Sequence, residues 1–230
     1  MSRSGAPSAK GLFRATGKRY KPVIVNKGRD LAGAFEVAES LAREPDDFYP
    51  TPPEPIRALI SVECNSLSLF SSIWEPAAGD GALVREMETC GFTVISSDLI
   101  DRGCGAQIKS FYDFRAPLSF AIVTNPPFAE CNEDPGWIRH ALETLAVEYM
   151  ALLLPVNWMG SGDRRAKLWA DFPPARIYLM RWRIDFTGQG APPMLNAWYI
   201  WDRTWCGETV LRMLDRKDAR QHELFGGDAA

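Results

Sequence analysis

Short apolar runs bounded by turn-forming residues recur along the chain. Runs of this length with turn residues on both sides are typical of strands. Because polar residues rarely interrupt them, the runs predict strands buried on both faces, as in a parallel sheet covered by helices. The predicted strands are 71–76, 92–99, 118–127 and 148–158, a short strand before 111–114, and two last strands within 175–186 and 195–203 that flank the loop 187–194.

Apolar residues at helical spacing lie between these runs. After Asp30 they include Leu31, Phe35 and Leu41, and Pro45 ends the pattern. Since strands and helices alternate, we expect one α/β domain over 30–230, with a Rossmann-like, mostly parallel seven-stranded sheet, helices on both faces and a C-terminal antiparallel hairpin. The predicted helices are 30–44, 55–64, 81–91, 135–146 and 162–172.

The composition fits one soluble globular domain. The chain has 230 residues, of which 46% are hydrophobic and 24% are charged. No stretch approaches the roughly 18 consecutive apolar residues of a membrane span, and the N-terminal residues lack the apolar segment of a secretory signal. Five scattered cysteines without a CxxC pair indicate reduced thiols and no metal site. We therefore expect a cytoplasmic protein.

The net charge of -3 hides an uneven distribution. Residues 1–29 carry eight lysines and arginines and no acid, with glycine, serine and proline interspersed. This composition predicts a flexible basic arm. The arm is either a solubilising tail or a contact for nucleic-acid phosphates, which would add salt-dependent affinity without sequence preference.

Candidate chemistry follows the predicted strands, where ligands of parallel sheets bind. The segment WEPAAGDG (74–81) has glycines that allow a tight turn but lacks the lysine and hydroxyl residue of a phosphate loop. Its acids, Glu75 and Asp80, favour a cationic or hydroxyl-rich ligand. Asp98 ends the next strand, where a carboxylate can accept hydrogen bonds from a ribose diol. Asp113 could accept from an adenine amine.

A rigid tetrad, Asn125-Pro126-Pro127-Phe128, ends the strand 118–127. Taken alone, it fits a stiff turn that closes a central strand. Together with the glycine loop and the acids, it resembles the motifs of a known enzyme family. WEPAAGDG, Asp98, SFYDF and TNPPF stand in the order found in S-adenosylmethionine-dependent amino-methyltransferases, which methylate adenine N6 or cytosine N4 in DNA. The likeness runs from about Phe48 to Arg203.

This resemblance implies a class I methyltransferase fold, S-adenosylmethionine as cofactor and flipped adenine in DNA as target. Tyr49-Pro50-Thr51-Pro52 matches the family segment that closes over the cofactor carboxylate, and the segment order and the last hairpin look like those of small phage-type adenine-N6 enzymes. The implied cofactor-binding residues are Thr51, Glu75, Pro76, Ala77, Gly79, Gly81, Asp98, Asp113 and Phe114.

The tetrad then has a chemical purpose. An exocyclic aromatic amine is a poor nucleophile because its lone pair is delocalised. The side-chain carbonyl of Asn125 and the backbone carbonyl of Pro126 can each accept one N–H and direct the lone pair at the sulfonium methyl for direct displacement. Pro127 restricts Pro126, and Phe128 can stack on the base, which must first leave the duplex.

We expect no separate target-recognition domain within this sequence. DNA contacts are therefore expected from the arm, from the segment 157–172 and from the C-terminal hairpin, where cationic and aromatic residues alternate. The alternative is that the charged residues form a solvated helix face and the aromatic residues belong to the core. RNA adenine, DNA cytosine N4 and a protein glutamine amide remain alternative targets. The substrate-binding candidates are Trp158, Arg164, Arg165, Arg183 and Phe186.

Overall fold

The computed structural model describes residues 50–133, 136–160, 163–186 and 194–217. The chain divides into a unit of residues 1–47 and a unit of residues 48–230, and the description concerns the second. The predicted basic arm 1–29 and the predicted helix 30–44 lie outside the described residues, as does most of the loop 187–194.

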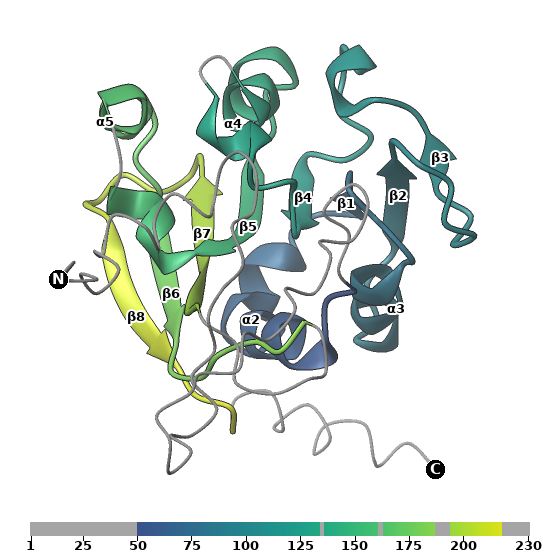
Figure 1. The fold of residues 1–230 in the computed structure, drawn as a ribbon, viewed down its shortest axis with the longest axis horizontal. Coiled ribbons are helices and arrows are strands. Elements are labelled where there is room, and N and C mark those ends of the chain that lie inside the picture. Colours follow the sequence, from purple (N-terminus) through teal and green to yellow (C-terminus); the bar gives the residue numbers. More distant parts are fainter. Residues whose placement is uncertain (1–49, 134–135, 161–162, 187–193, 218–230) are drawn as a thin grey trace, which may run out of the picture. The chain divides into compact units, whose positions relative to one another are not determined.

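An eight-stranded sheet forms the centre of this unit, in the order β3-β2-β1-β4-β5-β7-β6-β8 (Figure 1). β7 runs antiparallel to β5 and β6, and the other neighbouring pairs are parallel. The α/β class and the mostly parallel Rossmann-like sheet are confirmed. The strands are β1 Ile73–Glu75, β2 Val94–Asp98, β3 Gln107–Ile108, β4 Ala121–Thr124, β5 Tyr149–Pro155, β6 Arg176–Met180, β7 Asn196–Asp202 and β8 Val210–Leu214.

The sheet has one strand more than the seven expected from the sequence. The additional strand, β8, lies at the edge and pairs with β6. Leu211 is 57% exposed and Met213 is 59% exposed, whereas Leu214 is buried. A half-exposed edge strand carries no continuous apolar run, so the pattern that revealed the central strands could not reveal this one.

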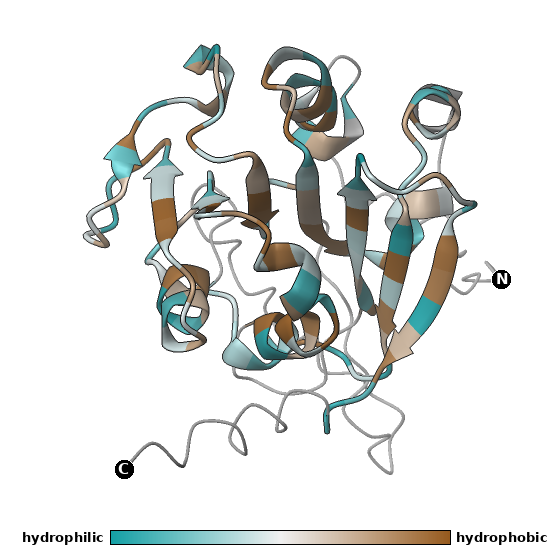
Figure 2. Ribbon diagram, turned by 180° about the vertical axis from the view of Figure 1, so that it is seen from behind, coloured by the Kyte–Doolittle hydropathy of each residue, from teal (hydrophilic) through white to brown (hydrophobic). Residues whose placement is uncertain are grey.

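Helices cover both faces of the sheet, and each face has its own core. Apolar residues of α2 and α3 pack on one face with Ile73, Val123 and Trp198. α4 and α5 contribute to the other core, which contains Trp74 and Tyr199. Figure 2 shows hydrophobic residues along the central strands between these layers. The helices are α2 Pro53–Leu67, α3 Ala82–Thr89, α4 Trp137–Arg139 and α5 Asp163–Asp171; short η segments are Phe111–Asp113, Glu130–Asn132, His140–Thr144 and Val156–Gly160.

The helices begin and end at residues with particular backbone properties, and these are not always the limits of the apolar pattern. α2 begins at Pro53, where a proline at the first helical position loses no hydrogen bond. α3 starts after Gly81, at φ +81°, and Gly91 follows its end at φ +89°. The predicted helix 135–146 is instead the single turn α4 continued by the π-helix His140–Thr144, in which Leu145 N–H donates to the His140 carbonyl.

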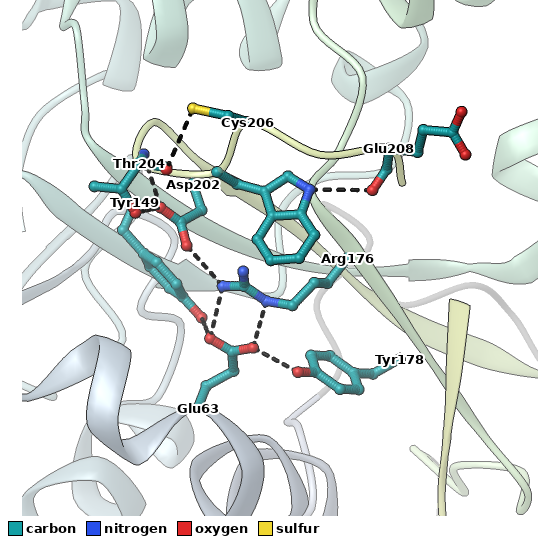
Figure 3. Close-up of polar contacts among 9 residues, drawn as sticks. Glu63, Tyr149, Arg176, Tyr178, Asp202, Thr204, Cys206 and Glu208 are labelled. Carbon is teal, nitrogen blue, oxygen red and sulfur yellow. Dashed lines mark hydrogen bonds and ion pairs between the residues drawn. The ribbon is translucent and has the colours of Figure 1, made fainter. Parts of the chain in front are cut away.

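A buried ionic network fastens α2 to the sheet (Figure 3). Glu63 of α2 is 2% exposed and accepts two hydrogen bonds from Arg176, at 2.7 and 2.9 Å. Tyr149 and Tyr178 donate to the same carboxylate at 3.2 and 2.6 Å. Arg176 also donates to Asp202 at 2.9 Å. Burial raises the pKa of both tyrosines, so they stay protonated as donors.

Within the described ranges, no helix is both long and apolar enough to span a membrane.

Candidate functional site

The site lies where the carboxyl ends of β1, β2 and β4 meet. These strands are neighbours in the sheet and run parallel, so the residues that end them share one edge. Glu75, Asp98 and Thr124 are the last residues of the three strands. The Thr124 hydroxyl donates to Glu75 Oε1, which joins the glycine loop to the strand that carries the tetrad.

The loop after β1 forms a close backbone turn against Asp98. Gly79 N–H donates to Asp98 Oδ2 at 2.7 Å, and Ile100 N–H donates to Asp98 Oδ1 at 2.8 Å. Asp98 is 8% exposed. A carboxylate offers about four acceptor positions, so Asp98 can still accept from a ligand hydroxyl. Asp98 is therefore held against the glycine loop by the Gly79 N–H group.

Gly81 cannot be replaced without strain. Its φ of +81° lies in the left-handed region, and a Cβ there would come within 2.9 Å of Cys104 Cβ. Cys104 belongs to the turn after β2, and its thiol donates to the Gly79 carbonyl at 3.3 Å. The turn after β2 thus lies against the glycine loop, and the missing side chain makes this approach possible.

Glu75 is a buried acid for which the described part of the chain supplies no cationic partner in hydrogen-bond contact. Its exposed fraction is 0%, and Oε1 accepts from Thr124 and from Ala77 N–H. Oε2 is buried and has no hydrogen-bond partner among the described residues. Burial raises the pKa of Glu75 to about 8, against the hydrogen bonds from Thr124 and Ala77, which lower it. The group is therefore mostly neutral at pH 7, and a nearby ligand cation would favour its ionised form.

Asn125, like Glu75, has a buried side-chain oxygen that can accept a hydrogen bond. Its Nδ2 donates to the Thr51 hydroxyl at 3.0 Å. Its Oδ1 is buried and, in the part of the chain that the structure describes, makes no hydrogen bond. A buried polar atom left without a partner is uncommon and costs stability. Two such oxygens, Glu75 Oε2 and Asn125 Oδ1, therefore stand at the ends of adjacent strands.

The rest of the tetrad is fixed by its neighbours. Pro126 is buried. The Pro127 carbonyl accepts from the N–H groups of Glu130 and Cys131, at 3.1 and 3.4 Å, which sets the direction of the chain after the tetrad. Phe128 is half-buried and packs against the core that contains Trp74. The predicted catalytic segment thus lies directly after β4, which ends at Thr124, and not within a strand as the predicted range 118–127 implied.

The other predicted cofactor residues lie at the same edge with different exposure. Pro76 is buried and Ala77 is half-buried in the turn after β1, and Asp113 is exposed. Phe114 is 4% exposed, and its ring lies 4.9 Å from that of Trp74. Lys109 Nζ lies 4.3 Å from the centre of the Phe114 ring. Phe114 is therefore part of the core that contains Trp74.

The predicted substrate-binding residues are not gathered in one place. Trp158 is 3% exposed, and its indole N–H donates to the Cys131 carbonyl at 3.2 Å. Its position in the core leaves no face for base stacking, so we leave it out of the proposed DNA surface. Arg164 and Arg165 belong to α5, and the positions of their side chains lie outside the described structure.

The segment after β6 lies beside Thr51. Pro52 and Pro55 line one hollow together with Trp182 and Ile184. Arg183, in the same segment, is exposed, and Phe186 is half-buried against the core on the α2 side. Trp182 and Ile184 thus lie near Pro52, the residue after Thr51.

Sequence reasoning missed the direct contact between Thr51 and Asn125, and the role of Thr124. The two residues in the first contact are 74 positions apart. Thr51 carried a family-based signal, but for a cofactor contact. Thr124 stands directly before the tetrad. A hydroxyl residue at the end of an apolar strand was the feature of the sequence that could have indicated its contact with Glu75.

No family model and no curated protein matches the chain. Solved structures with a similar arrangement include a candidate class I S-adenosylmethionine-dependent methyltransferase of Listeria monocytogenes (16% identity, TM-score 0.48, 71% of this chain). Others are the M protein of the type I restriction enzyme EcoKI (17%, 0.44, 66%) and the N-methyltransferase NodS of Bradyrhizobium japonicum (15%, 0.37, 64%).

The aligned parts amount to 65%, 43% and 97% of those three chains. The chain therefore spans less than two thirds of the first two neighbours. At these identities and TM-scores the likeness by itself decides no chemistry, which has to be argued from the residues of this chain.

Proposed function

We propose that the protein is an S-adenosylmethionine-dependent methyltransferase that acts on the exocyclic N6 amine of adenine in DNA. The observation that carries the proposal is the buried Oδ1 of Asn125, directly after β4, to which the described residues offer no hydrogen-bond partner. An acceptor held in place without a partner is what a substrate N–H requires. Its place one residue beyond Thr124, which bonds to the glycine-loop acid, puts the acceptor next to the proposed cofactor site.

The residues around the glycine loop fit such a cofactor. The ligand has a ribose diol, a methionine ammonium and a carboxylate, and when bound it supplies an electrophilic methyl group on a sulfonium. Asp98 would accept from the ribose hydroxyls, and Glu75 Oε2 would face the ammonium. Gly79 and Gly81 keep the turn free of side chains. Asp113 with Phe114 would bind the adenine end.

Asn125 and the prolines would act on the amine. Asn125 Oδ1 accepts one N–H and the Pro126 carbonyl accepts the other, which favours the pyramidal nitrogen of the transition state over the flat one of the free base. The tetrad is already rigid, so little reorganisation is needed at the moment of reaction. Methyl transfer would form the nitrogen–carbon bond as the sulfur–carbon bond breaks, with the neutral thioether leaving and the proton displaced from the amine passing to water. Phe128 would stack on the flipped base.

Cationic residues at this edge of the sheet would hold the nucleic acid. Arg183 is exposed beside the hollow that Pro52 and Trp182 line. The basic arm 1–29 and the α5 arginines, Arg164 and Arg165, are the remaining candidates from the sequence. Contacts of this kind neutralise phosphates and make affinity fall as salt rises.

Adenine in RNA, cytosine N4 in DNA and a glutamine amide present the same kind of N–H₂ group. The asparagine at the first tetrad position favours adenine within the family resemblance. The test is incubation with radiolabelled S-adenosylmethionine and, separately, duplex DNA, single-stranded DNA, RNA and a glutamine-containing protein. Nucleoside and amino-acid analysis of the labelled product identifies the acceptor. Label in N6-methyladenine from DNA is the expected result, and label only in another acceptor would contradict the proposal.

Asn125→Ala is the decisive variant. Loss of a preorganised acceptor in a buried site costs about 10²–10³ in kcat, while cofactor affinity should stay within about threefold. Asn65→Ala is a matched control, because Asn65 is an exposed asparagine near the C-terminal end of α2. An Asn125→Ala protein with near wild-type turnover would show that the tetrad is only a structural turn.

A further inference from the structure

The side chain of Asn125 can adopt two orientations related by a half-turn of its amide. One orientation presents Oδ1 to a substrate amine, and the other presents an NH₂ group. Only the first can accept an N–H. An amine donor facing an amide donor would be repelled, so something must favour one orientation before the substrate arrives.

The structure places Thr51 at this amide. The Thr51 hydroxyl accepts from Asn125 Nδ2 at 3.0 Å, and Thr51 is 7% exposed. Asn125 Oδ1 is the atom left without a partner in the described structure. The opposite orientation would pair Oδ1 with Thr51 and leave the N–H₂ donors buried and unpaired. Orphaned buried N–H groups are rarer than under-satisfied carbonyls, so the hydroxyl favours the observed orientation.

Thr51 is itself held rigidly. It stands between Pro50 and Pro52, two residues before α2, and proline restricts the residue before it to extended backbone. The first turn of α2 is fixed to β7, where the Trp198 indole N–H donates to the Pro55 carbonyl at 2.9 Å. Arg57 joins α2 to α3 through Glu86, with a donor–acceptor distance of 2.8 Å.

We propose that Thr51 is a positioning residue that fixes the Asn125 amide with its oxygen toward the target amine. This inference rests on the proposed function and deepens it. It also gives Thr51 a task different from the cofactor-carboxylate contact that the family resemblance implies. The two tasks predict different consequences when the hydroxyl is removed.

The test uses Thr51→Val, which keeps the side-chain shape without the hydroxyl, and Thr51→Ser, which keeps the hydroxyl. Thr209→Val is the control, because the Thr209 hydroxyl donates to the Pro174 carbonyl at 2.6 Å before β8, far along the sheet order from β4. The chain has six asparagines. With ¹⁵N-labelled asparagine, the Asn125 side-chain signal is assigned from its loss in Asn125→Asp.

The first readout does not depend on activity. In the wild type, Thr51→Ser and Thr209→Val, one Asn125 amide proton should exchange slowly with water, whereas in Thr51→Val exchange should be about tenfold faster or more. If the wild type methylates no offered acceptor, the proposed function fails, but this comparison still decides whether Thr51 fixes the amide. Equal protection in Thr51→Val and the wild type would overturn the inference.

The second readout separates positioning from cofactor binding. Thr51→Val should lower kcat about tenfold or more with the calorimetric Kd for S-adenosylmethionine within about threefold, and Thr51→Ser should recover most of the loss. A Kd weakened by more than tenfold with unchanged kcat at saturation would overturn the inference in favour of the cofactor-carboxylate contact.

Discussion

Replacing Glu75 by glutamine should change how stability depends on pH. In the folded protein, burial raises the pKa of Glu75 to about 8, from 4.5 for an exposed glutamate. The folded state therefore holds a proton that the unfolded chain has lost at every pH between these values. Stability falls as pH rises wherever the folded state binds more protons. The Glu75 contribution should thus be unfavourable and should grow from pH 4.5 to pH 8.

The size follows from the shift. One pKa unit corresponds to about 1.4 kcal/mol, so the full cost above pH 8 approaches about 5 kcal/mol. Between pH 5.5 and pH 7.5 the expected slope is about 1.4 kcal/mol per pH unit. Glutamine cannot ionise, and its carbonyl can still accept from Thr124 and Ala77, so any loss of packing should be a constant offset.

The assay is urea unfolding followed by tryptophan fluorescence at pH 5.5, 6.5 and 7.5, with linear extrapolation. The difference in unfolding free energy between Glu75→Gln and the wild type should rise in favour of the variant by about 2–3 kcal/mol across this window. Contributions from other titrating groups cancel in the difference. Glu88→Gln, an exposed site on α3, controls for the loss of one negative charge. A difference that stays flat with pH would refute the reasoning.

Three further predictions concern the Glu63 network, the glycine loop and Asp98, the proposed ribose-binding acid. Glu63→Gln should destabilise the fold by about 3 kcal/mol or more, because it leaves the buried Arg176 without its bidentate partner. Urea unfolding measures this loss, and a change under about 1 kcal/mol would contradict the account. Gly81→Ala should lower the unfolding free energy by about 1–3 kcal/mol, because of the positive φ and of the contact with Cys104. Gly105→Ala is the control: its φ is +79° but a Cβ there meets no neighbour, so it measures the cost of positive φ alone. Asp98→Ala should weaken S-adenosylmethionine binding about tenfold or more by calorimetry, and unchanged affinity would show that the ribose partner lies elsewhere.

The sequence predicted the sheet centre and the edge that carries the site, for one reason. β1, β4 and β5 are buried along their whole length, so their apolar runs are unbroken and the residues that end them stand out. Glu75 and Asn125 were singled out because they stand at the ends of such runs, and Asp98 because it ends the predicted strand 92–99, whose counterpart β2 is only partly buried. β8 was missed because it is half-exposed.

Contacts between distant parts of the chain could not be read in this way. Thr51 meets Asn125 only because prolines and the α2 packing bring the start of that helix to the end of β4. Glu63 interrupts an apolar helix face, and periodicity alone treats such an acid as a surface residue. Its true surroundings, Arg176 and the two tyrosines, come from β5 and β6, whose positions relative to α2 depend on the complete fold.

Glu63 and Glu75 show how surroundings decide what a buried carboxylate does. Both are almost fully buried, at 2% and 0% exposure. Glu63 receives Arg176 and two tyrosine hydroxyls at the edge where β5 and β6 begin, and its charge is satisfied. Glu75, at the opposite edge, has two donors on one oxygen and none on the other among the described residues. The same substitution to glutamine should therefore destabilise the protein at position 63 and, at pH 7.5, stabilise it at position 75. A buried acid that the fold leaves incompletely paired keeps its binding capacity for a ligand, and this one ends the strand beside the one that carries Asn125.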